Sequence, residues 1–188
     1  MTRIDELLMD YPKTWVLEDG TKVIVRPMEK RDRENLALFF RHIPEDELRF
    51  LKDDVTDRRV IDQWIDNLNY ERVLPLLGEL DGRIIADASL HRRKEGWRRH
   101  LGGLRVVVDP EFRHKGLAAG LLVELMDIAQ AEGLERLYTE LPADDQPAID
   151  LFRGRGFREV ARFARNVLDR AGKYHDLVVL HVDLSKKG

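Results

Sequence analysis

The chain has 188 residues, of which 43% are hydrophobic and 36% are charged, and it contains no cysteine. This length is that of one domain, with enough apolar residues for a core and enough charge for a soluble surface. The lack of cysteine excludes disulfides, thiolate catalysis and cysteine-rich zinc sites. A net charge of −3 argues against bulk electrostatic binding to nucleic acid.

The first half of the chain predicts an extension, one strand and two helices. Residues 1–20 are expected to form an N-terminal extension, a short helix with an extended lead-in that ends at a turn signal. Thr21–Met28 alternates as a strand. Lys30–Ile43 and Thr56–Leu68 carry apolar residues at helical spacing, and Thr56 is the expected N-cap of the second helix.

The middle of the chain changes to strands. Val73–Leu80 and Ile84–Leu90 flank Asp81-Gly82, which is a strong hairpin signal. Leu101–Val108 follows as a third strand, after the basic segment Arg92–His100. We interpret that segment as a solvated turn rather than a nucleic-acid contact, because the chain as a whole is acidic. Three strands joined by such turns predict an antiparallel meander.

The last third of the chain alternates between helices and strands. The expected elements are a helix over Gly116–Ala131 with Gly133 at its C-terminal cap, a strand over Arg136–Leu141, a short helix over Asp145–Arg153, and strands over Phe157–Val167 and Leu177–Leu184. The complete order, β, α, α, β, β, β, α, β, α, β, β, predicts an α+β (mixed α/β) fold rather than a doubly wound one.

Several kinds of site and location are not expected. The N-terminal segment has Asp5 and Glu6 where a signal peptide would need a long apolar run. No uninterrupted apolar stretch approaches the ~18 residues of a membrane-spanning helix. The six histidines show no HExxH or comparable spacing. We therefore expect a cytoplasmic protein with no membrane partner and no metal site.

The stretch from Val106 to Leu122 places a turn of small and basic residues between a strand and a helix. Asp109-Pro110 breaks the strand, and Arg113–Ala118 opens the helix. The free N–H groups and partial positive charge of a helix N-terminus bind anions such as pyrophosphate. Gly116 suits this role because a side chain there would keep phosphate from the backbone. The alternative is a plain turn glycine between solvated basic residues.

These residues resemble the GCN5-related N-acetyltransferase (GNAT) superfamily. Its acyl-CoA signature is Arg or Gln, two residues, Gly, one residue, then Gly or Ala, which stands here as Arg113–Ala118. A second family pattern runs here from Leu141 through Asp145 and Ala148 to Gly156-Phe157. The resemblance covers about Thr21 to Leu184. It implies one N-acetyltransferase domain over residues 21–184 with a tail at 185–188, and a mixed, mostly antiparallel sheet of about seven strands with about four flanking helices.

The resemblance also assigns residues to the donor. In this family the amides of the turn hold the CoA pyrophosphate, and the preceding strand pairs with the pantetheine arm. A bulge in that strand usually aims an N–H at the thioester carbonyl, and the expected donor here is Val107 or Val108. Asp145 replaces an Asn that commonly contacts the CoA arm. The implied donor-binding residues are Val106, Val107, Val108, Arg113, His114, Lys115, Gly116, Leu117, Ala118 and Asp145.

The side chains that the family most often uses in catalysis are missing at their usual positions. Phe152 stands where a Tyr often gives a proton to the departing thiolate, and Gly103 stands near the position of a common Glu base. Glu79 and Glu140 are therefore taken as substitute catalytic candidates. Each also fits a surface or structural role. The further candidates are His91 and Tyr138.

The resemblance implies an acyl-CoA-dependent N-acyltransferase with acetyl-CoA as donor substrate and a primary amine, small or on a protein lysine, as acceptor. The loop Pro44–Val55 and the helix Thr56–Leu68 would form one wall of the acceptor site. An acidic rim would favour a cationic acceptor, although an ordinary acidic helix entry explains it equally well. The rim residues are Glu45, Asp46, Glu47, Asp53 and Asp54.

Other classes of function remain open. The missing Tyr and Glu favour a catalytically silent acyl-CoA sensor or regulatory domain. A nucleic-acid module built on Arg92–His100 is the third hypothesis, and it predicts salt-dependent binding to DNA or RNA. The final strands often mediate dimers in the resembled family, so a homodimer is a further expectation.

Overall fold

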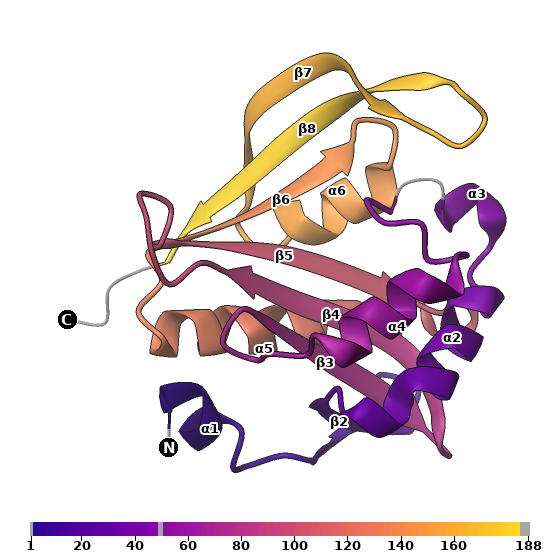
Figure 1. Ribbon diagram of the computed structural model, residues 1–188, viewed down its shortest axis with the longest axis vertical. Coiled ribbons are helices and arrows are strands. Elements are labelled where there is room, and N and C mark those ends of the chain that lie inside the picture. Colours follow the sequence, from indigo (N-terminus) through magenta and orange to yellow (C-terminus); the bar gives the residue numbers. More distant parts are fainter. Residues whose placement is uncertain (1, 49–50, 185–188) are drawn as a thin grey trace.

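The computed structural model describes residues 2–48 and 51–184, in which helices cover both faces of one central sheet (Figure 1). The strands are β1 (Lys13–Val16), β2 (Lys22–Pro27), β3 (Val73–Leu80), β4 (Arg83–Arg92), β5 (Leu101–Val108), β6 (Arg136–Pro142), β7 (Arg158–Leu168) and β8 (Tyr174–Asp183). The α-helices are α1 (Arg3–Leu7), α2 (Arg33–His42), α3 (Glu45–Leu48), α4 (Arg58–Asp66), α5 (Leu117–Ala131) and α6 (Gln146–Arg153). Two 3-10 helices are η1 (Lys30–Asp32) and η2 (Pro110–Phe112).

Within these described residues the sheet has eight strands in the order β1-β2-β3-β4-β5-β6-β8-β7. The mixed fold and the meander β3-β4-β5 are confirmed. The eighth strand comes from Lys13–Val16, which had been expected as an extended lead-in and instead pairs antiparallel with β2. Trp15 of this strand packs on Gly120 of α5, where an added Cβ would meet its ring at 2.9 Å. The missing side chain at Gly120 therefore makes room for Trp15, so that β1 packs against α5.

The two faces of the sheet bury separate cores. On one face α5 and α6 cover alternate strand residues, and the core includes Leu76, Leu121 and Phe152. On the other face α2 and α4 cover the intervening residues, with Phe39 and Leu77 among the buried side chains. The period-2 alternation of strands assigns neighbouring residues such as Leu76 and Leu77 to opposite faces. Figure 1 shows α2 and α4 on the opposite side of the sheet from α5.

Helix boundaries differ from expectation at two places. The N-cap of α4 is Asp57, whose carboxylate accepts a hydrogen bond from the Arg59 amide at 3.0 Å. The predicted cap, Thr56, instead donates its hydroxyl to Asp54. The four-residue helix α3 was not foreseen, because a single turn is too short to show helical periodicity.

The ends of the chain join the same body. Ile4 and Leu17, from the expected N-terminal extension, are buried in the core under α5. The expected tail at residues 185–188 lies outside the described residues. Across residues 2–48 and 51–184, no helix has the length and apolar character needed to cross a bilayer.

Candidate active site

The sheet opens between β5 and β6. These strands run parallel and pair from Leu101↔Arg136 to Gly103↔Tyr138. At the next position the Thr139 hydroxyl donates to the Leu104 carbonyl at 3.1 Å, and the strands then diverge. The resulting cleft has a volume of about 1840 Å³ and is lined by β5, β6, the N-terminus of α5, α6 and the segment after α3. It joins two ends, one beside α5 and one beside His91 and Tyr138. We call them the donor end and the acceptor end after the roles that the sequence resemblance implies.

The backbone at the donor end forms a tight turn. Gly116 has φ +84° and is the N-cap of α5, and His114 has φ +57°. The amides of the first helical turn have no intrahelical acceptor and lie along the cleft at Leu117 and Ala118. A Cβ added at Gly116 would also meet the Glu18 carboxylate at 3.1 Å. The left-handed backbone favours glycine here, whereas the end of the flexible Glu18 side chain could shift to make room.

The basic side chains of the turn are mostly engaged. The Arg113 guanidinium pairs with Glu47 of α3 at 2.8 Å and donates to the Val108 carbonyl at 3.1 Å, so it ties the turn to the end of β5. The Glu47 carboxylate raises the pKa of Arg113. Lys115 lies outside the cleft and pairs with Asp19 at 2.9 Å. The free main-chain amides, rather than charged side chains, are therefore the main groups at this end that can attract an anion.

Val106, Val107 and Val108 of β5 line the cleft. The edge of β5 at these residues is unpaired because β6 pairs only as far as Gly103. Val106 and Val108 pack toward the α5 core, while Val107 packs toward α2 and α4. The expected bulge is absent from this part of the described structure: β4 and β5 pair in unbroken register from Ala86↔Val108 to Arg92↔Gly102. The strands separate because β5 and β6 stop pairing, so no extra residue is needed.

The C-terminal wall of the cleft is formed by α6. Asp145 is its N-cap and accepts a hydrogen bond from the Ala148 amide at 3.3 Å. Burial raises the pKa of the Asp145 carboxyl. Phe152 is 2% exposed and packs edge-on against Phe157 at 5.1 Å between ring centroids. Its ring borders the cleft without any group that can donate a proton.

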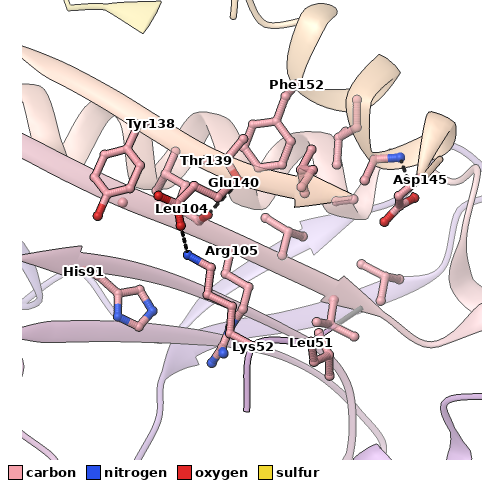
Figure 2. Close-up of a pocket in the computed structure, with 18 of the residues that line it drawn as sticks. Leu51, Lys52, His91, Leu104, Arg105, Tyr138, Thr139, Glu140, Asp145 and Phe152 are labelled. Atoms are coloured by element: carbon pink, nitrogen blue, oxygen red, sulfur yellow. Dashed lines mark hydrogen bonds and ion pairs between the residues drawn. The ribbon is translucent and has the colours of Figure 1, made fainter. Parts of the chain in front are cut away.

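The acceptor end brings together side chains from three adjacent strands (Figure 2). His91 on β4 lies opposite Gly103 on β5, and Gly103 lies opposite Tyr138 on β6. An added Cβ at Gly103 would lie 3.0 Å from the Tyr138 hydroxyl, so the ring of Tyr138 fills the space of the missing side chain. Glu140, two residues further along β6, also lines the cleft and forms an ion pair with Lys52.

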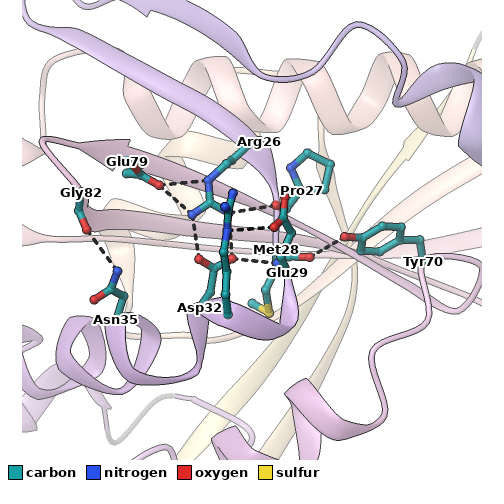
Figure 3. Close-up of polar contacts among 10 residues, drawn as sticks. Arg26, Pro27, Met28, Glu29, Asp32, Asn35, Tyr70, Glu79 and Gly82 are labelled. Atoms are coloured by element: carbon teal, nitrogen blue, oxygen red, sulfur yellow. Dashed lines mark hydrogen bonds and ion pairs between the residues drawn. The ribbon is translucent and has the colours of Figure 1, made fainter.

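The structure does not bring Glu79 to this cleft (Figure 3). Its carboxylate accepts two hydrogen bonds from Arg26, at 2.9 and 2.6 Å, and Arg26 also binds the buried carboxylate of Asp32. These contacts fasten β2, β3 and the start of α2. Glu79 was expected as a catalytic substitute because it lies on a strand, but the geometry gives it a structural ion pair.

The acidic rim of the acceptor wall is largely neutralised. Its carboxylates at Glu47, Asp53 and Asp54 pair with Arg113, with Arg105 at 3.4 Å, and with Arg170. The side chain of Asp46 lies outside the described part of the structure. Glu45 is exposed, so the ion pairs weaken the expected attraction of the rim for cations without abolishing it. These pairs, together with Lys52–Glu140, hold the segment after α3 across the cleft.

The basic segment Arg92–His100 is exposed except at its start. Trp97 is 87% exposed on the loop, as a solvated turn predicts. The Arg92 side chain is instead buried and forms an ion pair with Glu132. Sequence reasoning also missed Lys52, Arg105 and Ser89. No local motif marks them, since contacts between distant segments bring Lys52 and Arg105 to the cleft and place the buried Ser89 beneath it, next to His91.

Comparison with known proteins places the chain in a family. Residues 37–157 match the acetyltransferase (GNAT) family. The chain belongs to this family. The GNAT fold expected from the turn Arg113–Ala118 is thereby confirmed. The matched residues include β5 and β6, the two strands that border the cleft.

Relatives and solved structures agree with this assignment. The chain is 32% identical over 80 residues to a [ribosomal protein bS18]-alanine N-acetyltransferase of Salmonella typhimurium, covering 43% of this chain and 53% of that protein. It is 32% identical over 117 residues to a mycothiol acetyltransferase of Clavibacter michiganensis, covering 60% and 34%. The chain thus spans between a third and about half of the length of these relatives. The protein yncA of Salmonella typhimurium, solved with its cofactor acetyl-CoA, shares the fold with a TM-score of 0.74 at 21% identity, covering 88% and 96%.

Proposed function

We propose that the chain is an acyl-CoA-dependent N-acyltransferase that moves an acetyl group from acetyl-CoA to a primary amine. The observation that carries the proposal is the open edge of β5 leading to the glycine turn of α5. An extended arm can add to a strand edge through main-chain hydrogen bonds, and its anionic end can then meet the free amides of a helix N-terminus. That combination fits a pantetheine arm with a pyrophosphate.

The proposed reaction is direct attack on the thioester. The amine nitrogen forms a bond to the carbonyl carbon, the carbon–sulfur bond breaks, and the thiolate takes up a proton. A backbone N–H of β5, at Val107 or Val108, is the proposed donor to the developing oxyanion. Glu140 is retained as a candidate for proton transfer because it lines the cleft, whereas Glu79 lies outside it.

The name of one relative supports an amine acceptor, and the name of another supports acetyl transfer to a small molecule. One acetylates the alanine of ribosomal protein bS18, and the other is a mycothiol acetyltransferase. The acceptor of the present chain is proposed as a primary amine on a small molecule or a protein. The ion pairs of Glu47, Asp53 and Asp54 weaken the electrostatic argument for a polyamine in particular.

A cytoplasmic homodimer is part of the same proposal. β7 is the outer strand of the sheet, and its exposed apolar residues Val160 and Phe163 are 49% and 50% accessible. Apolar side chains along an exposed strand edge favour pairing with another chain. A second copy of this chain is the proposed occupant, which light scattering of the purified protein can test.

A silent acyl-CoA sensor is the second candidate, favoured by the buried Phe152 at the usual Tyr position. Thiol release from acetyl-CoA separates the two functions. The assay offers an alanine-initiated peptide, a lysine-containing peptide and putrescine, and mass spectrometry follows the acetylated product. If the chain is an enzyme, at least one of these amines is acetylated, and one CoA thiol is released for each N-acetyl group formed. Tight CoA binding without thiol release on any of them supports the sensor and contradicts the proposal.

A further inference from the structure

At the position near which the family often carries a catalytic Glu, this chain has a glycine flanked by a histidine and a tyrosine on the neighbouring strands. The position near which family members often carry a Glu is Gly103, and its cross-strand neighbours are His91 and Tyr138. Residues paired across neighbouring strands point to the same face of a sheet. Because Gly103 has no side chain, the Tyr138 ring leans over it toward His91, and these two side chains border a slot above β5; the backbones of β4 and β6 lie about 10 Å apart at two strand spacings. All three residues line the cleft.

The imidazole of His91 is held by one defined contact. Its Nε2 lies 3.0 Å from the Oγ of Ser89, which stands two residues earlier on the same face of β4 and is 2% exposed. When Nε2 carries the proton and donates it to Ser89, Nδ1 keeps a lone pair that can accept a proton. Ser89 is therefore placed to hold the ring in one orientation and to accept the Nε2 proton in the tautomer that a base requires.

The surroundings favour an uncharged ring. Burial is the main effect that lowers the pKa of His91, to about 4, and the positive charges of Arg105 on β5 and Lys52 on the facing segment act in the same direction. Asp53 on that segment acts in the opposite direction. Near neutral pH the ring is consequently uncharged, with a lone pair on one nitrogen, and it is a weaker base than a free imidazole.

We propose that His91 is the general base of the acetyl transfer, and that Ser89 is its positioning residue. This inference rests on the proposed function. As the N–C bond forms, the amine becomes an acidic ammonium, and its proton passes to Nδ1 of His91. The C–S bond then breaks, and the departing thiolate receives a proton from the imidazolium or from water. The row of His91 lies roughly 13 Å along β5 from Val107, at about 3.3 Å per residue, so the proposed transfer runs through a chain of several water molecules.

Other side chains at the slot suit this role less well. The Glu140 carboxylate is already paired with Lys52. The Tyr138 ring lies beneath the Arg98 guanidinium at 5.2 Å from its centroid and leans over Gly103. His91, by contrast, has one ring nitrogen anchored on a buried hydroxyl and the other available.

Kinetics of three variants test the inference with acetyl-CoA and whichever of the three panel amines reacts fastest. His91→Gln should lower kcat about 100-fold or more, the usual contribution of a general base, while the Kd for CoA stays unchanged. Ser89→Ala should lower kcat about fivefold, as expected for the loss of one neutral hydrogen bond. Imidazole added to His91→Gly should restore part of the rate. His42→Gln, at an exposed ring bonded to the Leu38 carbonyl, is the matched control and should keep the wild-type rate.

Nitrogen NMR of the histidine rings gives a readout that a structural role would not produce. At pH 7 His91 should be neutral with its proton on Nε2, and Ser89→Ala should reduce that preference. A charged ring or an Nδ1–H tautomer overturns the inference, as does full activity of His91→Gln beside a wild-type enzyme that acetylates an amine. Loss of activity in Tyr138→Phe or Glu140→Gln with His91→Gln still active also overturns it. If wild type acetylates none of the amines, the proposed function fails and this inference fails with it.

Discussion

The donor end of the cleft is formed mainly by main-chain groups, and the acceptor end is formed mainly by side chains. The donor end is mainly backbone: an open strand edge, a left-handed glycine at position 116 and the first turn of α5. The acceptor end is mainly side chain, contributed by β4, β6 and the segment after α3. A site made of backbone depends on the conformation of one continuous stretch, whereas a site made of side chains depends on how distant stretches meet.

The two ends also differ in charge. At the donor end the side chains of Arg113 and Lys115 are paired with Glu47 and Asp19, which leaves the helix amides as the main attraction for an anion. At the acceptor end His91 is an uncharged ring among charged neighbours. We therefore expect mutations to affect donor affinity at one end and proton transfer at the other, and the following changes test that separation.

The largest effect is expected at the turn. Gly116→Glu places a carboxylate at the proposed pyrophosphate site and a side chain where the backbone has φ +84° and Glu18 approaches. Juxtaposed like charges cost several kcal/mol, so CoA affinity should fall at least about 100-fold in calorimetry. Gly133→Glu is the matched control, because it has φ +83° with open space around it at the other end of α5. Equal loss of affinity in both variants would assign the effect to backbone strain.

The next effect compares Gly102 and Gly103, which lie on opposite faces of β5 where this strand still pairs with β6. A Cβ at Gly102 would lie 2.7 Å from Leu137 and 2.9 Å from both Leu90 and Leu134, inside the core. Gly102→Ala should therefore lower the free energy of unfolding by about 1–3 kcal/mol, the usual cost of overpacking. Gly103→Ala, facing Tyr138 at 3.0 Å, should affect stability less and kcat more. Denaturant titration and steady-state kinetics give the comparison, and the reverse ranking would contradict it.

Stability should depend on pH through His91. Its folded pKa of about 4 lies below the ordinary value of 6.5, so the unfolded chain binds the proton more readily and stability falls as pH drops through this interval. At pH 5 the loss is about 2 kcal/mol. The fall in unfolding free energy from pH 7 to pH 5 should be smaller by that amount in His91→Gln. An identical fall in the variant and wild type would mean that the acceptor end does not keep this ring uncharged.

The smallest effect concerns the charge on the turn. Glu47→Gln removes the carboxylate that pairs with Arg113, which then becomes available to phosphate. Since partly exposed ion pairs contribute up to about 1 kcal/mol, CoA affinity should rise two- to fivefold. Titration at low and high salt should show that the gain shrinks as salt screens it. Weaker binding would instead show that the Glu47–Arg113 pair shapes the donor end.

The conformation of the glycine turn could be predicted from the sequence better than the arrangement around His91, for a physical reason. The strand–turn–helix order around Gly116 is local, so the conformation of that stretch can be inferred from its own residues. The role of Glu79 could not be inferred, because Arg26 and Asp32 reach it only through strand pairing. In the same way, the slot between His91 and Tyr138 depends on the register of three strands.

The fold shows the same division between local and distant information. Alternation and turn residues predicted the meander β3-β4-β5 and the long helix α5. The short strand β1 was missed because it is stabilised by pairing with β2 and by packing on Gly120, which no pattern within residues 13–16 reveals.

The most direct test of the account is a crystal structure of the chain with CoA bound. The account predicts the pyrophosphate against the amides of residues 116–118, the pantetheine arm along the open edge of β5, and the sulfur on the side of the cleft that leads to His91. CoA bound elsewhere, or with its pyrophosphate away from this turn, would contradict the assignment of the donor end and, with it, the division of the cleft.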